Sequence, residues 1–131
     1  MSRRELREQI FKLLFRVEFN SLEDMPEQEE LFFDQEDAAQ GEDADYISDK
    51  YNKICQKLTE LDAMLDEKAK GWNTKRMSKV DLTILRLAVY EIEYDDSVPG
   101  SVAINEAVKL AKKFGQDASS SFVNGILAKF V

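Results

Sequence analysis

Apolar residues recur at spacings of three and four along most of the chain, which is the period of one face of an α-helix. They form a wide stripe over residues 3–20 and a narrower seam over residues 44–70, typical of a helix lying nearly antiparallel to its neighbours. Further helices are expected near 26–36, from Ser78 and over 101–114, and a last helix should bury Phe122, Val123, Ile126, Leu127 and Phe130. No segment shows the alternation of apolar and polar residues, bounded by hairpin turns, that is typical of β-strands. The pattern therefore predicts an all-α protein of six or seven helices.

Small and turn-forming residues indicate where these helices begin and end. Val98-Pro99-Gly100 should break the chain before the fifth helix, and Gly115 should end that helix in a left-handed cap. Ser78 with Asp81 forms a variant of the capping box, in which the hydroxyl accepts from the first turn of the helix. Asp117 is placed to cap the sixth helix.

The length of 131 residues suits one domain. We expect a single domain over 1–131, with an N-terminal lobe at about 1–71 and a C-terminal lobe at about 72–131 packed together. Trp72 is predicted to be a core residue where the lobes join. Gly125 costs about 1 kcal/mol inside a helix, so we expect it to pack against neighbouring backbone, or alternatively to leave an approach path for RNA or protein.

Histidine is absent and Cys55 is the only cysteine. The chain therefore lacks the commonest general base, the commonest metal ligand and the residues of the usual zinc sites. It also has no glycine-rich phosphate loop. We expect a binding protein and not an enzyme, with no catalytic residues, no metal and no cofactor. No signal-like segment and no apolar run near the roughly 18 residues of a membrane span occurs, so a cytoplasmic location without membrane attachment is expected.

A net charge of −8 argues against nucleic acid until the charges are counted by segment. Residues 21–49 hold twelve acidic residues and no basic one, and the remainder of the chain is mildly basic. We interpret this segment as a solvated connector, made of a short helix and a mobile loop. A sharper alternative is that it repels RNA from one face or mimics RNA.

Three arginines open the chain. Arg3, Arg4 and Arg7 fall within an arc of roughly 100° on an ideal helix. Guanidinium groups bind phosphates in a bidentate manner and stack on unpaired bases. The alternative is ordinary solvated charge, partly paired to Glu5 and Glu8.

A second candidate site is the turn from Phe114 to Ser121, which leads into a helix start. Amides and hydroxyls in such a turn can hydrogen-bond phosphates or base edges. Helix capping alone explains the same residues. Lys112 and Lys113 add positive charge nearby.

Three segments in order resemble the NusB family of bacterial transcription factors: VDLTILRLAVYE at 80–91, the stretch 98–112, and FG with FVNGIL within 114–127. The amino end is similar to the family's arginine-rich start, whereas residues 21–70 match only in helical character. The resemblance implies a fold of two helical lobes. It also implies binding of boxA-type single-stranded RNA together with the ribosomal protein NusE, and an effect on elongation by RNA polymerase in antitermination, termination and ribosomal RNA synthesis.

The resemblance also implies roles for particular residues. Those expected to contact RNA are Arg3, Arg4, Arg7, Phe114, Gly115, Ser119, Ser120, Phe122 and Asn124. Tyr90, Glu91 and Glu93, expected at the exposed end of the central helix, are candidates for the NusE surface. Related proteins often carry another acidic residue in the turn where Ala118 stands. A helical adaptor that binds proteins without contacting RNA is the alternative, and a homodimer through the first helix would hide the arginines.

Overall fold

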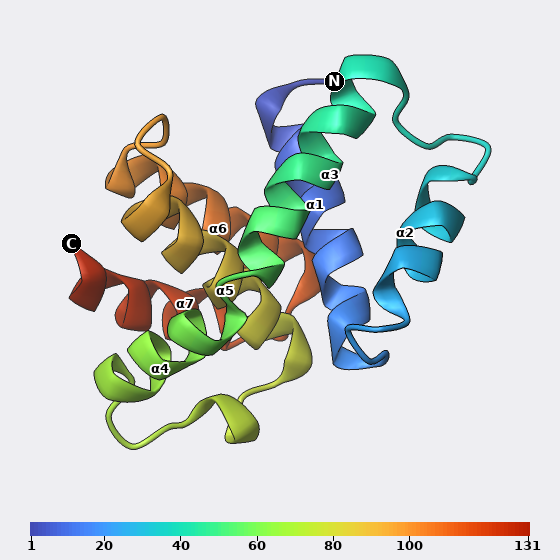
Figure 1. Ribbon diagram of the computed structural model, residues 1–131. Coiled ribbons are helices and arrows are strands. Elements are labelled where there is room, and N and C mark those ends of the chain that lie inside the picture. Colours follow the sequence, from blue (N-terminus) through green and yellow to red (C-terminus); the bar gives the residue numbers. More distant parts are fainter. The chain divides into compact units, whose positions relative to one another are not determined.

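The computed structural model describes residues 1–131 and consists of seven α-helices and three short 3₁₀ helices, with no strand (Figure 1). The prediction of an all-α protein with six or seven helices is confirmed. No helix is both long enough and apolar enough to cross a membrane. The chain divides into two compact units, residues 1–55 and 56–131. The lobe boundary was predicted near residue 71. In the structure the helix Leu58–Lys68, which precedes residue 71, belongs to the second unit.

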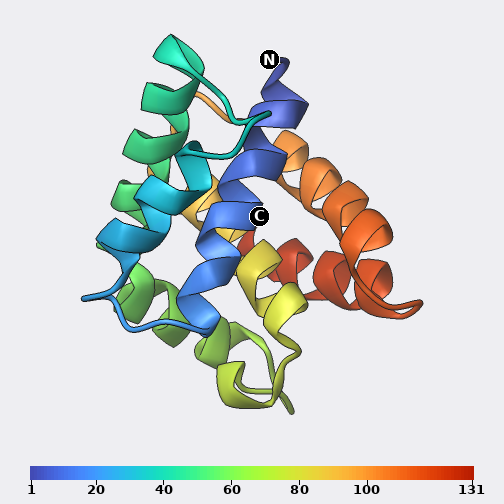
Figure 2. The same ribbon diagram turned by 90° about the vertical axis from the view of Figure 1, so that its right-hand side faces the viewer.

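The first unit contains α1 (Arg3–Phe15), α2 (Met25–Phe33) and α3 (Gly41–Cys55). α1 packs against α3, and both helices start at the same end of the unit (Figures 1 and 2). The α-amino group of Met1 donates to Oδ2 of Asp43 over 3.0 Å, which holds the two starts together. α3 is therefore parallel to α1, not antiparallel as predicted, because α2 returns the chain between them.

α2 carries three of the twelve acidic residues of the 21–49 segment and is anchored on both sides. Arg16, at the end of α1, donates to the backbone oxygen of Gln28 over 3.2 Å, and its guanidinium lies 5.3 Å from the ring centroid of Phe32. From α3, the hydroxyl of Ser48 donates to Oε1 of Glu29 over 2.7 Å. The expected solvated connector is therefore in part a packed helix.

The predicted long helix over 44–70 is instead two helices, α3 and α4 (Leu58–Lys68). Residues 55–57 contain no proline or glycine, so local propensity does not predict the break. The apolar seam is buried in both halves, at Ile54 and Leu61 for example, but α3 packs against α1 whereas α4 packs against α5. The break follows from this change of packing partner.

The second unit is organised around α5 (Lys79–Tyr94), which packs against α4, α6 (Gly100–Phe114) and α7 (Ser119–Leu127). Every residue from Asp81 to Glu91 is buried. The prediction that this helix is surrounded by others is confirmed.

Polar contacts and small residues fix the helices of this unit. The hydroxyl of Ser78 accepts from the Asp81 amide over 3.1 Å, as the capping pattern predicted. Arg86 donates from Nε and Nη2 to the two carboxylate oxygens of Asp62 on α4, each over 2.8 Å. Along α6 the alanines that face inward are fully buried, which lets α5 and α7 approach closely; they are Ala103, Ala107 and Ala111.

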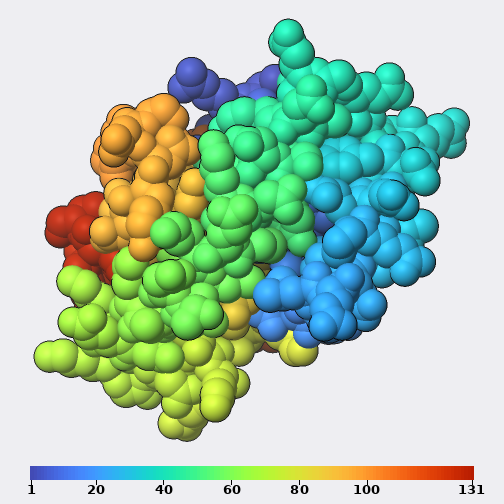
Figure 3. Space-filling view, in the orientation of Figure 1, coloured from blue at the N-terminus to red at the C-terminus, as the bar shows by residue number.

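The connection between α4 and α5 is a hydrogen-bonded turn at the surface, coloured yellow-green in the space-filling view (Figure 3). Asp66 accepts from the Thr74 amide over 2.7 Å, and Asn73 accepts from the Arg76 amide over 3.1 Å. Trp72 is 51% exposed, so its predicted place in the core is wrong. Its indole instead meets the ring of Phe122 on α7, with centroids 5.2 Å apart and planes at 70°.

Candidate nucleic-acid interface

The arginine-rich start of α1 is stabilised by a full capping box. The hydroxyl of Ser2 accepts from the Glu5 amide over 3.1 Å, and Oε1 of Glu5 accepts from the Ser2 amide over 3.0 Å. The hydrogen bond from the Ser2 backbone lowers the pKa of Glu5. At Met1, the hydrogen bond to Asp43 raises the pKa of the α-amino group. The helix start is thus fixed by charge as well as by backbone geometry.

The three arginines extend over the first two turns of this helix. Arg3 and Arg4 are exposed, and Arg7 is half-buried. The structure therefore brings these predicted residues together in the first unit, with two guanidinium groups at the surface. Such a group of cations suits phosphate oxygens.

The turn between α6 and α7 differs from the prediction at Gly115. Its φ is −92° and its ψ −171°, so it does not form a left-handed cap. A Cβ there would lie 2.5 Å from Cβ of Ser119 and 2.7 Å from the carbonyl oxygen of Ala111. Glycine is required at this position by close approach and not by the sign of φ.

Ser119 closes this turn from the inside. Its side chain is buried, and its hydroxyl accepts from the Gln116 amide over 2.9 Å. This contact braces the turn but does not cap α7, because the Gln116 amide precedes that helix. No side chain caps α7: Asp117 is exposed, so its predicted cap is wrong, and the N-cap residue Ala118 makes no side-chain hydrogen bond.

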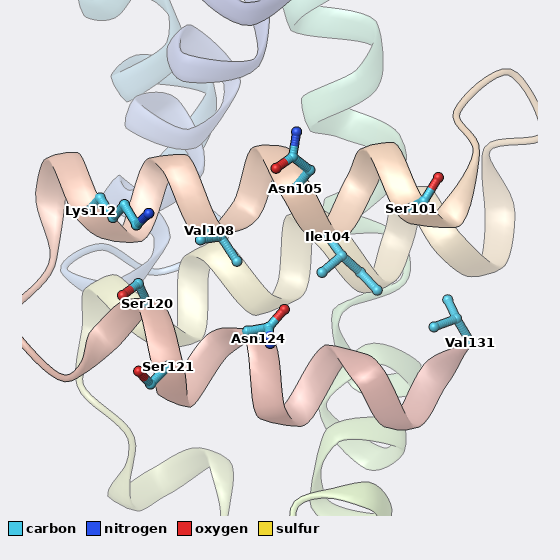
Figure 4. Close-up of a pocket in the computed structure, with 9 residues that line it drawn as sticks. All are labelled: Ser101, Ile104, Asn105, Val108, Lys112, Ser120, Ser121, Asn124 and Val131. Atoms are coloured by element: carbon cyan, nitrogen blue, oxygen red, sulfur yellow. The ribbon is translucent and has the colours of Figure 1, made fainter.

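Beside this turn a groove of about 590 Å³ lies between α6 and α7 (Figure 4). α6 lines it with apolar Ile104 and Val108 and with the charged end of Lys112, while α7 contributes the predicted residues Ser120 and Asn124. In Figure 4 the two apolar side chains point toward α7, and Asn124 points back toward α6. The groove thus combines an apolar floor with hydrogen-bonding groups and one cation.

Five residues of the groove were not predicted from the sequence: Ser101, Ile104, Asn105, Val108 and Val131. On α6 a signal was present, because residues 101, 104, 105, 108 and 112 follow helical spacing and share a face. Nothing along the chain indicated that α7 lies opposite that face.

Both predicted phenylalanines, Phe114 and Phe122, are half-buried. Along the chain Phe114 precedes the turn between α6 and α7, and Phe122 follows it. Phe114 ends α6, with the ammonium of Lys113 5.4 Å from its ring centroid. Phe122, on α7, supports the exposed indole of Trp72. The sequence did not identify Trp72 as a neighbour of the candidate site, because Trp72 is large and apolar and was assigned to the core.

The predicted partner surface on α5 is largely interior. Tyr90 is 8% exposed and Glu91 1%, so their predicted exposure is wrong. Glu93 is exposed, and Tyr94 beside it is 37% exposed and contacts the ring of Tyr90 with centroids 5.6 Å apart. The surface at this end of α5 therefore consists of Glu93 and Tyr94.

The sequence and the structure were compared with known proteins. The chain matches the model of the family described as the NusB family over residues 4–131. A protein of Agathobacter rectalis named transcription antitermination protein NusB is 53% identical over 130 residues, which are 99% of this chain and 99% of the relative.

Solved structures show the same fold. The NusB of T. maritima superposes with a TM-score of 0.84 at 32% identity, covering 99% of this chain and 90% of that one. A structure of the antitermination factors NusB and NusE in complex with double-stranded RNA gives a TM-score of 0.79 at 22% identity, covering 98% of this chain and 94% of that one. At the lower identity the likeness is one of fold.

Proposed function

This chain belongs to the NusB family, and from that premise we propose that it is a transcription antitermination factor that binds boxA-type single-stranded RNA together with the ribosomal protein NusE. In this role it would act on the elongating RNA polymerase, including during ribosomal RNA synthesis. The observation that carries the RNA-binding part is the groove between α6 and α7, whose lining suits an unpaired nucleotide.

The chemistry of the groove supports this proposal in three ways. The amide of Asn124 both donates and accepts hydrogen bonds, as reading a base edge requires. Ile104 and Val108 provide apolar surface for the flat face of a base, and Lys112 provides a charge for the neighbouring phosphate. Ser119 acts as a positioning residue, because its hydroxyl accepts from the Gln116 amide and so ties the start of the helix that carries Ser120 and Asn124 to the preceding turn.

The arginines of α1, in the first unit, are proposed as separate RNA contacts. Arg3 and Arg4 are exposed in a helix start held by the Ser2–Glu5 capping box. Their guanidinium groups suit contacts with phosphates, which orient RNA without reading its sequence.

Few phosphate contacts make binding weak and sensitive to salt. The chain also has a net charge of −8, so we infer that RNA binds poorly to it alone and better when NusE adds contacts. The solved structure that contains NusB, NusE and double-stranded RNA shares the fold of this chain, which makes NusE the partner to test. Glu93 and Tyr94 are our candidates for the NusE surface, in place of the buried Tyr90 and Glu91.

We also propose that the chain is a cytoplasmic binding protein and not an enzyme. The absence of histidine and the single cysteine support a binding role. Cys55 is the only cysteine, so no disulfide can form within the chain, which suits a reducing compartment.

The test is a titration of fluorescein-labelled boxA-like RNA, read by anisotropy at several salt concentrations, with and without NusE. Exchanging Arg3, Arg4 and Arg7 for Glu, or making Lys112→Gln, should weaken binding, and the lysine change should reduce the salt slope by about 0.7. Lys53→Gln, an exposed lysine on α3, is the matched control.

Equal RNA affinity with and without NusE would reject the cooperative part of the proposal. If the arginine and groove variants both keep wild-type RNA affinity, the site is misplaced. If the protein binds NusE but no RNA under any condition, the chain is a protein adaptor.

A further inference from the structure

The turn between α4 and α5 concentrates positive charge. No acidic residue lies between Glu67 and Asp81, and the basic residues in this stretch are Lys68, Lys70, Lys75, Arg76 and Lys79, all exposed. The second unit as a whole has eleven basic and eleven acidic residues, so the charge is local to the turn. A local positive potential of this kind attracts polyanions.

Trp72 stands in the middle of this basic turn. Half of its surface reaches solvent, although its edge-to-face contact with Phe122 fixes the position of the indole. An aromatic ring that is supported on one side and exposed on another is the feature on which proteins stack unpaired bases. Neighbouring cations then bind the phosphates on either side of the stacked base.

The turn is held in a fixed conformation before any ligand arrives. Asp66 binds the amide and, at 3.4 Å, the hydroxyl of Thr74, while Asn73 caps the single-turn helix at Arg76. Gly71 has a φ of +85°, which other residues rarely adopt and which directs the chain into this turn. A preformed surface loses less entropy on binding than a mobile loop would.

We propose that Trp72, supported by Phe122 and flanked by Lys70, Lys75 and Arg76, is a stacking platform for an unpaired base of single-stranded RNA. This inference rests on the proposed RNA-binding function and extends it to a second contact. Phe122 lies on the face of α7 opposite the groove residues Ser120 and Asn124, so the platform and the groove are two separate contacts.

The exposed indole favours RNA over an acidic protein segment as the ligand of this turn. An acidic peptide would use the cations of the turn but has no flat π-surface to place on Trp72. Single-stranded RNA uses both the cations and the ring.

The only tryptophan of the chain is Trp72, so its emission reports directly on the proposed platform. Unlabelled boxA-like RNA at low salt should quench the emission in a saturable manner, at the concentrations at which the labelled RNA shows a rise in anisotropy. Poly-L-glutamate serves as the probe for an acidic protein. If it quenches the emission and RNA does not, the surface binds acidic protein and the proposal fails.

Three variants test the residues. Trp72→Leu keeps apolar cover over Phe122 and should weaken RNA binding by about tenfold or more, whereas Trp72→Phe should weaken it less. Lys75→Gln with Arg76→Gln should reduce the salt slope by about 1.4. Urea unfolding of each variant, with Lys53→Gln as control, shows that the fold is retained.

Failure of this inference differs from failure of the proposed function. Suppose that RNA raises the anisotropy but does not change the tryptophan emission, and that all three variants bind RNA with wild-type affinity and salt slope. The platform is then refuted and RNA binding stands. If RNA produces no anisotropy change under any condition, both proposals fail.

Discussion

Arg86 on α5 and Asp62 on α4 form a two-pronged ion pair, with Nε and Nη2 each 2.8 Å from a carboxylate oxygen. The Arg86 side chain is 11% exposed and that of Asp62 28%. The pair thus joins a buried position of the central helix to a helix at its side. Its loss would leave a guanidinium in the interior without this carboxylate.

Asp62→Ala should therefore lower the free energy of unfolding by about 2 kcal/mol, since hydrogen bonds between charged groups contribute about 1.5–3 kcal/mol and solvent screens part of this pair. Urea unfolding measures the change. Glu60→Ala, at an exposed acid on the same helix, should stay within about 0.5 kcal/mol of the wild type. Equal midpoints for the two variants would show that the pair does not stabilise the fold.

Gly115→Ala should destabilise the protein by about 2 kcal/mol, because the added methyl group overlaps Ser119 and the backbone oxygen of Ala111. The overlap with backbone cannot be relieved by rotating a side chain. Thermal unfolding followed by circular dichroism is the measurement. An unchanged midpoint would contradict the close approach in this turn.

Gly125→Ala should have the opposite effect. A Cβ at Gly125 would meet no atom within 4 Å, so the close packing expected from the sequence is wrong. Alanine there should stabilise α7 by about 1 kcal/mol through helix propensity. A drop in the unfolding midpoint would indicate that this face of α7 is covered.

Glu5→Gln tests the capping box through pH. The folded protein lowers the pKa of Glu5 below its ordinary value of 4.5, so the charged carboxylate stabilises the fold above that pH. This stabilisation is lost as the pH falls through the lower folded value. The wild type should melt above the variant at neutral pH, and the difference should disappear in acid. A difference that persists below the folded pKa would assign the effect to shape and not to charge.

Within the second unit, α5 and α6 were predictable because their apolar stripes agree with the residues at their ends. Ser78 caps α5 as expected, and α6 ends at Phe114 as expected. The break between α3 and α4 was not predictable, since residues 55–57 contain no helix breaker and only the packing partner changes there.

The candidate site was predictable only in part, for reasons that differ between residues. Asn124 was found because it lies in a family motif, and Ser120 because it lies in the turn from Phe114 to Ser121, but Asn105 required knowledge of which helix faces α7. Tyr90 and Glu91 were placed at the surface because of their polarity, whereas packing buries them. The basic turn around Trp72 was not recognised from the sequence because charge was counted over long segments. In such a segment the acidic residues of α5 and of the chain just after it cancel the charge of the lysines in the turn.

The excess of acid lies wholly in the first unit, which has fifteen acidic and seven basic residues, while the second unit is balanced. The net charge of −8 thus belongs to the first unit alone. A polyanion such as RNA is repelled by that unit, whereas the second unit is neutral as a whole and carries the basic turn. Contacts between RNA and the second unit can therefore form without a net electrostatic cost from that unit.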